Sequence, residues 1–190
     1  MSEISLLPKS PLVNAEAGLF GAQRTDDAGV VLSADADRMI LQVLGASGTS
    51  AVPETIALWA GDEPLAVRDN GPGNWIVVCS DRRPPSDVAE LSDRLEGQAT
   101  VVDQSHGRTL IKVSGSKVER MLASGVALDL HMDHFAPGTS ATTLVGHITV
   151  LLTRTGEHSF ELAVLSSFVQ SLWDSLITMS RPFGVDARPA

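Results

Sequence analysis

The amino-acid sequence predicts an α+β protein made of two fused split βαβ repeats of the ferredoxin-like type. One observation is that most apolar runs have the length of strands and are separated by turn residues. A second is that the order strand, helix or loop, two strands, helix, strand occurs twice along the chain. A doubly wound parallel sheet is the lesser alternative, because long helices between successive strands are missing.

The domain organisation follows from changes in composition. The 190 residues suffice for one domain or for two small lobes that share a core. Residues 1–27 contain Pro8, Pro11 and Gly18 without sustained periodicity, so we expect an irregular N-terminal arm. Residues 28–190 are expected to form a single unit with repeats at 28–103 and 104–184, because no polar linker divides them.

The first repeat is predicted from short apolar runs. Strands are expected at 30–32, 39–44, 56–60, 65–67 and 75–79, although 39–44 also suits a helical turn. The segment 45–53 is expected to be a loop or short helix, and the turn residues at 69–74 indicate a hairpin. Ser86 is expected to cap a helix that ends at Gly97, followed by a strand at 99–102; its inward residues are Val88, Leu91 and Leu95.

The second repeat is predicted in the same order. A strand at 109–113 turns at Gly115 into a helix at 116–123, and a loop occupies 124–138. Strands are expected at 143–153 and 159–165, separated by Gly156. A final helix starts near Ser166 or Ser167, and its apolar stripe consists of Phe168, Leu172, Trp173, Leu176 and Ile177.

Composition excludes several classes of protein. Lysine and arginine total 14 against 23 acidic residues, giving a net charge of −9, and no basic stripe exists for binding nucleic acid. Cys79 is the single cysteine, which excludes an intramolecular disulfide and favours a reducing cytoplasm. No run approaches the roughly 20 apolar residues that span a bilayer, so we expect a cytoplasmic protein that binds neither nucleic acid nor membrane.

The sequence contains no complete catalytic constellation, and we expect no catalytic residue in this chain. Dinucleotide, phosphate-loop and GxSxG motifs are missing, and the segment 115–117 is interpreted as a turn and helix cap. His131, Asp133 and His134 lie within four residues but lack a clear fourth ligand, so no metal site is predicted. Cys79 is expected to be buried in a strand and inert.

Six residues are candidates for structural or interface roles. Asp103, Ser105 and Arg108 surround the point where the repeats join, where an internal pair between Asp103 and Arg108 is favoured over catalysis. Trp75, Phe168 and Trp173 are expected to lie in the core or at an interface. The hairpin acids Glu157 and Glu161 are of a type that binds a ligand amine or pterin, although a solvated surface acid is the ordinary alternative.

A series of segments resembles the gamma subunit of heterotetrameric sarcosine oxidase. The match covers about residues 70 to 184 and extends more weakly back to about residue 28. Its members are GNWIVV at 73–78, VDQSHGR at 102–108, IKVSG at 111–115, LASG at 122–125, LDLH at 128–131, FAPG at 135–138, TLVGH at 143–147, FELAV at 160–164, SF at 167–168 and LW at 172–173.

That family in turn resembles the folate-binding domain of the glycine-cleavage aminomethyltransferase, which implies the repeated split βαβ fold. The resemblance implies an accessory subunit of a flavoenzyme complex that demethylates sarcosine to glycine and transfers the one-carbon unit to tetrahydrofolate. It implies alpha, beta and delta partner subunits that carry FAD, FMN, NAD, zinc and tetrahydrofolate. The glycine-rich hairpin, here residues 154–161, is shortened and the acidic catalytic motif is missing, so the only cofactor candidate in this chain is Glu157.

Other functions stay open at this point. The same accessory role is possible in a complex that acts on another N-methylated amino acid or a secondary amine. A stand-alone one-carbon protein that binds tetrahydrofolate is a further alternative. The third alternative is a structural module that binds an unrelated partner.

Overall fold

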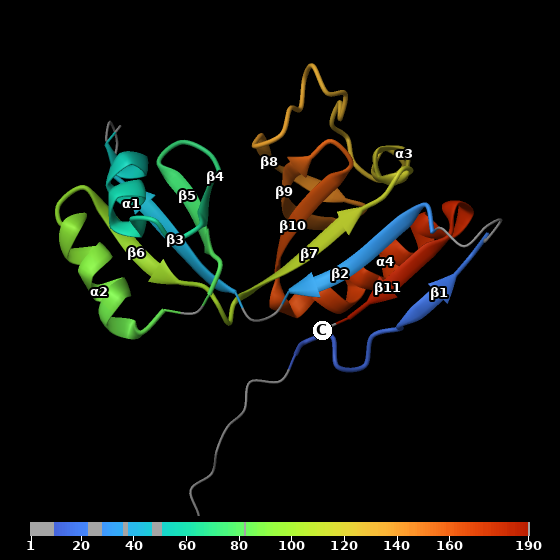
Figure 1. Cartoon of the computed structure of the whole chain (residues 1–190), viewed down its shortest axis with the longest axis horizontal. Helices are drawn as coiled ribbons and strands as arrows, with labels where there is room; N and C mark the ends of the chain where they lie inside the picture. Colours follow the sequence, from blue (N-terminus) through green and yellow to red (C-terminus); the bar gives the residue numbers. More distant parts are fainter. Residues whose placement is uncertain (1–9, 23–27, 36–37, 47–50, 82, 190) are drawn as a thin grey trace, which may run out of the picture.

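The chain folds into two lobes that lie side by side, as Figure 1 shows. The computed structural model describes residues 10–22, 28–35, 38–46, 51–81 and 83–189. The smaller lobe contains residues 39–103, and the larger lobe contains the described residues on both sides of that segment.

The smaller lobe has the topology of one split βαβ repeat. Its elements are β3 (Met39–Gly45), α1 (Val52–Ala60), β4 (Leu65–Asp69), β5 (Asn74–Cys79), α2 (Pro85–Arg94) and β6 (Ala99–Asp103). The strands form an antiparallel sheet in the order β4-β5-β3-β6. β4 and β6 are therefore its edges, and both helices pack on one face.

The larger lobe is an elaborated second repeat. Its elements are β1 (Gly18–Phe20), β2 (Val30–Asp35), β7 (Arg108–Ser114), α3 (Val118–Leu122), β8 (Ser140–Val145), β9 (Ile148–Gly156), β10 (Ser159–Leu165), α4 (Val169–Ser180) and β11 (Val185–Arg188), with single 3-10 turns at Ser166–Phe168 and Arg181–Phe183. The sheet order is β1-β11-β2-β7-β10-β9-β8. The order β7-α3-β9-β10-α4-β11 matches the first repeat, with β2 inserted beside β7 and β8 added at one edge.

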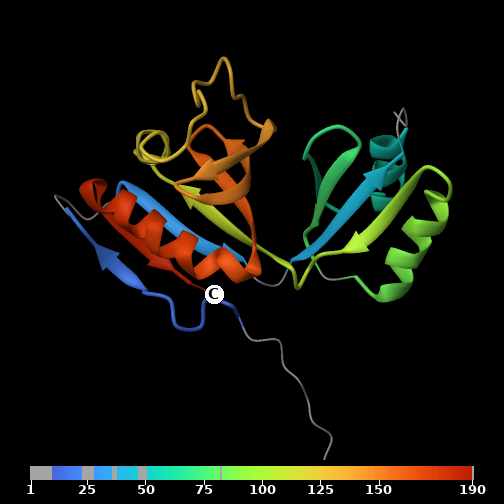
Figure 2. The same cartoon turned by 180° about the vertical axis from the view of Figure 1, so that it is seen from behind.

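Three apolar clusters hold the described residues together. The largest lies between the larger sheet and α4, which crosses the back of that sheet in Figure 2. The second lies between the smaller sheet and its two helices. The third joins the lobes and contains Ile40, Ile76, Val78, Leu110, Leu151 and Ala163.

Two predicted strands are wrong in detail. Residues 56–60 belong to α1, because Val52, Ile56 and Trp59 are buried at helical spacing and a proline begins the helix. The predicted strand at 143–153 is a hairpin of β8 and β9, which turns at Gly146 with a φ of 59°. A short apolar run fits either helix or strand, and a two-residue turn is easily hidden inside one.

The N-terminal residues differ from the expected irregular arm. Gly18–Phe20 forms β1 and pairs with β11, while Leu12 is buried in the largest cluster. Residues 1–9 and 23–27 of the expected arm lie outside the described residues. β2, which we expected in the first repeat, pairs with β7 in the larger sheet. The division into repeats at 28–103 and 104–184 stays a prediction, except that β2 belongs to the sheet of the second repeat.

The two predicted helix starts also differ. α2 begins at Pro85 after Pro84, and the hydroxyl of Ser86 makes no capping hydrogen bond to the helix. α4 begins at Val169 after a 3-10 turn, so Phe168 lies outside the buried stripe and is half exposed. The remaining members of the predicted stripe, Leu172, Trp173, Leu176 and Ile177, are buried.

Candidate functional site

The junction of the lobes brings together chemical groups that are distant in the sequence. Arg68 on β4 donates from Nη2 to Oε1 of Glu161 on β10 at 3.1 Å, and the two side chains are only 14% and 9% exposed. At the neighbouring sheet edges Thr142 Oγ1 donates to Asn70 Oδ1 at 2.8 Å. Glu161 is therefore bound to the partner lobe by an ion pair, which the sequence did not indicate because the two residues lie 93 positions apart.

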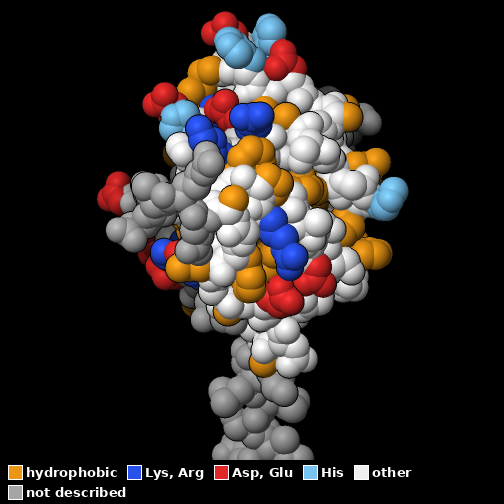
Figure 3. All heavy atoms as spheres, turned by 90° about the vertical axis from the view of Figure 1, so that its right-hand side faces the viewer, with side chains coloured by type: hydrophobic (Ala, Val, Ile, Leu, Met, Phe, Trp, Pro, Cys, Tyr) orange, Lys and Arg blue, Asp and Glu red, His pale blue; other side chains and the backbone are white. Residues whose placement is uncertain are grey.

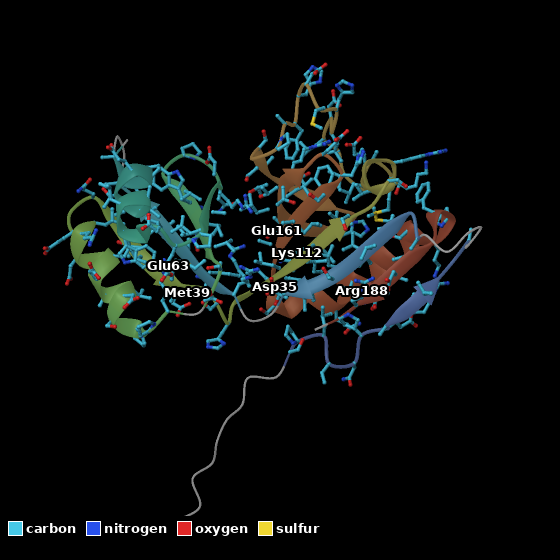
Figure 4. All side chains as sticks on the ribbon, viewed as in Figure 1. Asp35, Met39, Glu63, Lys112, Glu161 and Arg188 are labelled. Carbon is cyan, nitrogen blue, oxygen red and sulfur yellow. The ribbon has the colours of Figure 1, made fainter. Side chains whose placement is uncertain are left out.

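Charged side chains continue along this face of the larger sheet. Lys112 on β7 lies opposite Glu161 in the strand register, and its Nζ donates to Asp35 Oδ2 at 2.8 Å. Figure 4 shows Glu161, Lys112 and Asp35 one below another on this face. Burial by itself raises the pKa of Asp35, but the hydrogen bonds from Lys112 and Arg38 outweigh it and leave that pKa lowered. Asp35 therefore favours its charged form as a structural partner of these cations.

The expected pair between Asp103 and Arg108 is not formed. Oδ1 of Asp103 accepts hydrogen bonds from the main-chain N and the hydroxyl of Ser105, at 2.8 and 2.6 Å. The Ser105 hydroxyl in turn accepts from the main-chain N of Ile40 at 3.0 Å. Nε of Arg108 has no hydrogen-bond partner in the described part of the chain, and burial lowers the pKa of Arg108. The hydrogen bonds from Ser105 within this local turn therefore take the place of the expected ion pair with Arg108.

Arg154 organises the hairpin and the loop before it. Its guanidinium is fully buried, with Nη1 donating to the carbonyl of Glu157 at 2.6 Å. Nη2 donates to the carbonyl of Leu130 at 2.6 Å and to Glu119 Oε1 at 2.8 Å, and the group lies 4.7 Å from the Phe160 ring centre. Sequence reasoning missed this residue, because an arginine inside a strand gives no signal of burial.

Glu157 lies at the surface of the same hairpin. Its side chain is 75% exposed, and Oε1 is 3.7 Å from His158 Nε2. The Glu157 carboxylate is therefore a solvated surface acid. The main-chain carbonyl of Glu157, in contrast, accepts a hydrogen bond from Arg154.

The histidine cluster lies on the loop at 124–138. His134 Nδ1 is 2.5 Å from Asp129 Oδ2, and the His131 ring lies 6.1 Å from the His134 ring. The backbone N–H of His131, followed by the His134 side chain, lowers the pKa of Asp129. In the described residues no three histidine, cysteine or acidic side chains are arranged to hold a metal ion. Figure 3 shows histidine and acidic side chains together at the top of the molecule, where this loop lies.

The aromatic candidates separate into core and surface. Trp173 is fully buried, and its Nε1 donates to the carbonyl of Glu16 at 3.0 Å. Trp75 is half-buried on β5 against the core of the smaller lobe. Cys79 is buried in that core, and burial raises the pKa of its thiol. Phe168 alone among the aromatic candidates is exposed.

Phe168 borders an apolar surface at the end of β10. A hollow of about 130 Å³ is lined by His147, Ile148, Thr149, Leu165 and Phe168. Leu165 and Leu144 are also exposed, and Leu144 lies opposite Thr149 in the strand register. We call this set, comprising Leu144, Ile148, Leu165 and Phe168, the β8–β10 patch. Leu144, Leu165 and Phe168 are exposed and Ile148 is partly exposed, and a group of exposed apolar side chains is typical of an interaction surface.

The sequence profile of the GCVT N-terminal domain family matches residues 64–188, which is more than half of the chain. The chain belongs to this family. Among its relatives, sarcosine oxidase subunit gamma of Corynebacterium sp. (strain U-96) is 26% identical over 187 residues, which cover 90% of this chain and 88% of that protein. The subunit gamma of Corynebacterium sp. (strain P-1) is 33% identical over 121 residues, covering 63% of this chain and 54% of that protein.

Aminomethyltransferases are also similar to this GCVT-family chain. The enzyme of Herpetosiphon aurantiacus is 31% identical over 122 residues, covering 62% of this chain and 34% of that protein. The chain thus spans about half of the strain P-1 subunit and a third of this aminomethyltransferase. The resemblance to the gamma subunit, inferred from the sequence, is confirmed.

Solved structures confirm the fold class. A chain of the heterotetrameric sarcosine oxidase from Corynebacterium sp. U-96 in complex with pyrrole 2-carboxylate superimposes with a TM-score of 0.72 at 24% identity, covering 86% of this chain and 88% of that chain. The glycine cleavage system aminomethyltransferase T from Bartonella henselae gives a TM-score of 0.63 at 20% identity, covering 85% and 48%. At these identities the likeness concerns the fold.

The two hairpin carboxylates of this GCVT-family chain have different surroundings. Glu161 is buried against Arg68, so its oxygen is already paired. Glu157 lies at the surface and borders neither the hollow beside Phe168 nor the pocket lined by α2 and β6. Glu161 is therefore an ion-pair partner of Arg68, and a cofactor contact at Glu157 stays a prediction. No described helix has both the length and the apolar character needed to cross a membrane.

Proposed function

We propose that this chain is the accessory gamma subunit of a heterotetrameric sarcosine oxidase. The observation that carries the proposal is the similarity to a gamma subunit over 90% of this chain and 88% of that protein. The complex would demethylate sarcosine oxidatively to glycine and transfer the one-carbon unit to tetrahydrofolate. The gamma chain contributes no catalytic residue in this proposal.

The proposed partners are a large alpha subunit together with beta and delta subunits. These chains would carry FAD, FMN, NAD, zinc and tetrahydrofolate, and the assembly would be cytoplasmic. Another N-methylated amino acid or secondary amine is the alternative substrate, because the amine site in this proposal belongs to a different subunit.

Purification from the native host tests the assembly. A tagged copy of the full chain should be recovered with larger flavin-containing chains, and the eluate should show flavin absorbance and oxidise sarcosine. The separately expressed chain should be colourless and inactive towards sarcosine. Recovery of the native chain free of any flavoprotein would contradict the proposal, and a preference for dimethylglycine over sarcosine would select the alternative substrate.

The β8–β10 patch is the proposed contact with a larger subunit. Phe168→Ser should weaken retention of the partner chains about tenfold or more, because an exposed aromatic side chain is a frequent anchor of interfaces. The free energy of unfolding of the isolated variant should stay within about 0.5 kcal/mol of the wild-type value, because Phe168 is 50% exposed. Leu58→Ser on α1 is the matched control, since Leu58 is exposed on the other lobe. Equal retention by both variants would place the contact elsewhere.

Calorimetry distinguishes an accessory subunit from a stand-alone one-carbon protein that binds tetrahydrofolate. The match to the GCVT N-terminal domain favours a test of folate binding by the isolated chain. We expect no heat on titration with tetrahydrofolate at millimolar concentration. Saturable heat that is lost in Glu157→Gln would support the stand-alone one-carbon protein instead.

A further inference from the structure

A pocket lies beside the free edge of the smaller sheet and has no part in the proposed function. It encloses about 360 Å³ between one face of α2 and the ends of β3 and β6. Its lining consists of Met39, Arg83, Pro85, Val88, Ala89, Ser92, Val101 and Asp103. Most of these side chains are apolar, but the pocket carries one positive and one negative group. This volume is within the range of pockets that bind small molecules.

The positive group, Arg83, is buried and incompletely paired. Its side chain is only 10% exposed, and the guanidinium lies 4.2 Å from the Trp59 ring centre. Nη2 is 3.0 Å from Glu63 Oε2, but Nε and Nη2 form no aligned hydrogen bond with any described residue. Glu63 is 65% exposed, so this ion pair is screened by water. Nε and Nη2 are themselves covered, but another part of the Arg83 side chain lines the pocket. A carboxylate held in the pocket, away from water, would pair with this cation more strongly than the exposed Glu63 does.

The free edge of β6 supplies main-chain groups. Gln104 N donates to Ile40 O of β3 at 2.8 Å, and hydrogen bonds alternate along an antiparallel strand. Val101 and Asp103 therefore direct their main-chain groups away from β3, toward the open side. Ala99 faces the same side, but its N–H donates back to the end of α2. The edge thus offers two residues for pairing, too few for a long extended peptide.

Asp103 supplies the negative group. Its Oδ1 accepts from Ser105, which fixes the carboxylate beside the pocket, and the side chain is exposed. No ion pair joins Asp103 to Arg83 in the described residues. The two charges that line the pocket are therefore not paired with each other, and the other lining side chains are mostly apolar. A ligand that complements this arrangement carries a carboxylate, an ammonium group and an apolar body.

From this arrangement we propose that the pocket between α2 and β6 binds a free α-amino acid with an apolar side chain. Arg83 takes the carboxylate, Asp103 takes the ammonium group, and Val88, Ala89 and Val101 contact the side chain. The proposal does not depend on the role of the chain as an accessory subunit.

Titration of the full isolated chain with L-leucine tests the proposal. Amide resonances of Val101, Asp103 and Ala89 should shift together and saturate in the millimolar range. Isoamylamine, which lacks the carboxylate, and 4-methylpentanoate, which lacks the amine, should each bind about tenfold more weakly or worse. No saturable shift at tens of millimolar leucine would overturn the proposal. Equal binding by an acetylated and amidated leucine peptide would overturn it in favour of strand pairing.

Variants assign the two charges. Arg83→Gln should remove discrimination between leucine and isoamylamine, and Asp103→Asn should remove discrimination between leucine and 4-methylpentanoate. Asn at 103 retains an acceptor for Ser105, so the turn is preserved. Arg94→Gln is the matched control, because Arg94 lies exposed on α2 outside the pocket lining and pairs with Glu90. Retention of full discrimination by both charge variants would contradict the assignment.

A substitution that fills the pocket gives an independent test if the Arg83→Gln variant folds poorly. Ala89 is exposed on α2, so Ala89→Leu is compatible with the helix and occupies the pocket. It should abolish leucine binding while the circular dichroism spectrum and melting temperature stay unchanged. Unaltered leucine binding by this folded variant would overturn the proposal. Co-purification with flavoprotein chains is a separate readout, so failure of either proposal is recognised without the other.

Discussion

The two lobes share one topology but differ in how much they bury. Among the described residues, the main cluster of the larger lobe contains 24 buried side chains, and that of the smaller lobe contains 10. The larger sheet adds β1, β2 and β8 to the common plan, whereas the smaller sheet keeps four strands and a free edge at β6. The comparison teaches that the same topology can support a large core with added strands in one lobe and a small core with an open sheet edge in the other.

Removing the central side chain of the larger core should produce the greatest loss. Trp173→Ala should lower the free energy of unfolding by about 3 to 5 kcal/mol, because it leaves a large cavity under α4. Trp75→Ala in the smaller lobe is the matched control and should cost less, because Trp75 is half-buried. Chemical denaturation followed by circular dichroism measures both. Equal losses would remove the difference between the lobes.

Arg154→Met should have the next largest effect, about 2 to 3 kcal/mol. The substitution leaves the carbonyls of Leu130 and Glu157 without their buried donor. Faster hydrogen exchange should appear in the loop at 124–138, with the smaller lobe unchanged. Arg94→Gln, which removes an exposed pair, should cost less than about 0.5 kcal/mol. A loss spread evenly over both lobes would contradict the local role of Arg154.

The ion pair of Arg68 and Glu161 between the lobes is expected to contribute less to stability than Arg154 does. Glu161→Gln should cost about 1 to 2 kcal/mol, because it removes the charge that Arg68 meets at the junction. The double-mutant cycle with Arg68→Gln, measured by urea denaturation, isolates the coupling. Coupling near zero would show that the apolar cluster alone holds the lobes together.

The smallest effect concerns pH. The pKa of Asp35 is lowered in the folded state, so its contribution to stability is present above the unfolded pKa of about 4 and is lost as pH falls through the folded pKa. Asp35→Asn should be less stable than wild type by no more than about 1 kcal/mol at neutral pH. The difference should shrink below about pH 4, as followed by urea denaturation across pH. A difference that grows on acidification would contradict this sign.

Much of the fold followed from periodicity and turn residues. The α4 stripe, the β4–β5 hairpin and the buried face of α3 were predicted because each depends on neighbours in the sequence. The position of β2 was missed because a strand of six residues does not indicate which sheet it joins. The residues at 56–60 were assigned to a strand because five apolar residues satisfy either period.

The candidate sites were harder to predict than the fold. Asp103, Ser105 and Arg108 were singled out, but the predicted pair of Asp103 with Arg108 was wrong, because Ser105, two residues on, donates to Asp103 instead. Arg83 and Arg154 gave no signal, because their importance comes from burial in the folded chain. The pair of Arg68 and Glu161 depends on how two sheets meet, which no local pattern contains.

The position of β11 between β1 and β2 has a consequence for synthesis on the ribosome. β11 contains Val185–Arg188, and it pairs with strands from the beginning of the chain on both sides. Residues 39–103 form a contiguous lobe that can fold while translation continues, whereas the larger sheet is completed only after Arg188 has been made and has left the exit tunnel. A nascent chain truncated before this strand would leave β1 without its pairing partner.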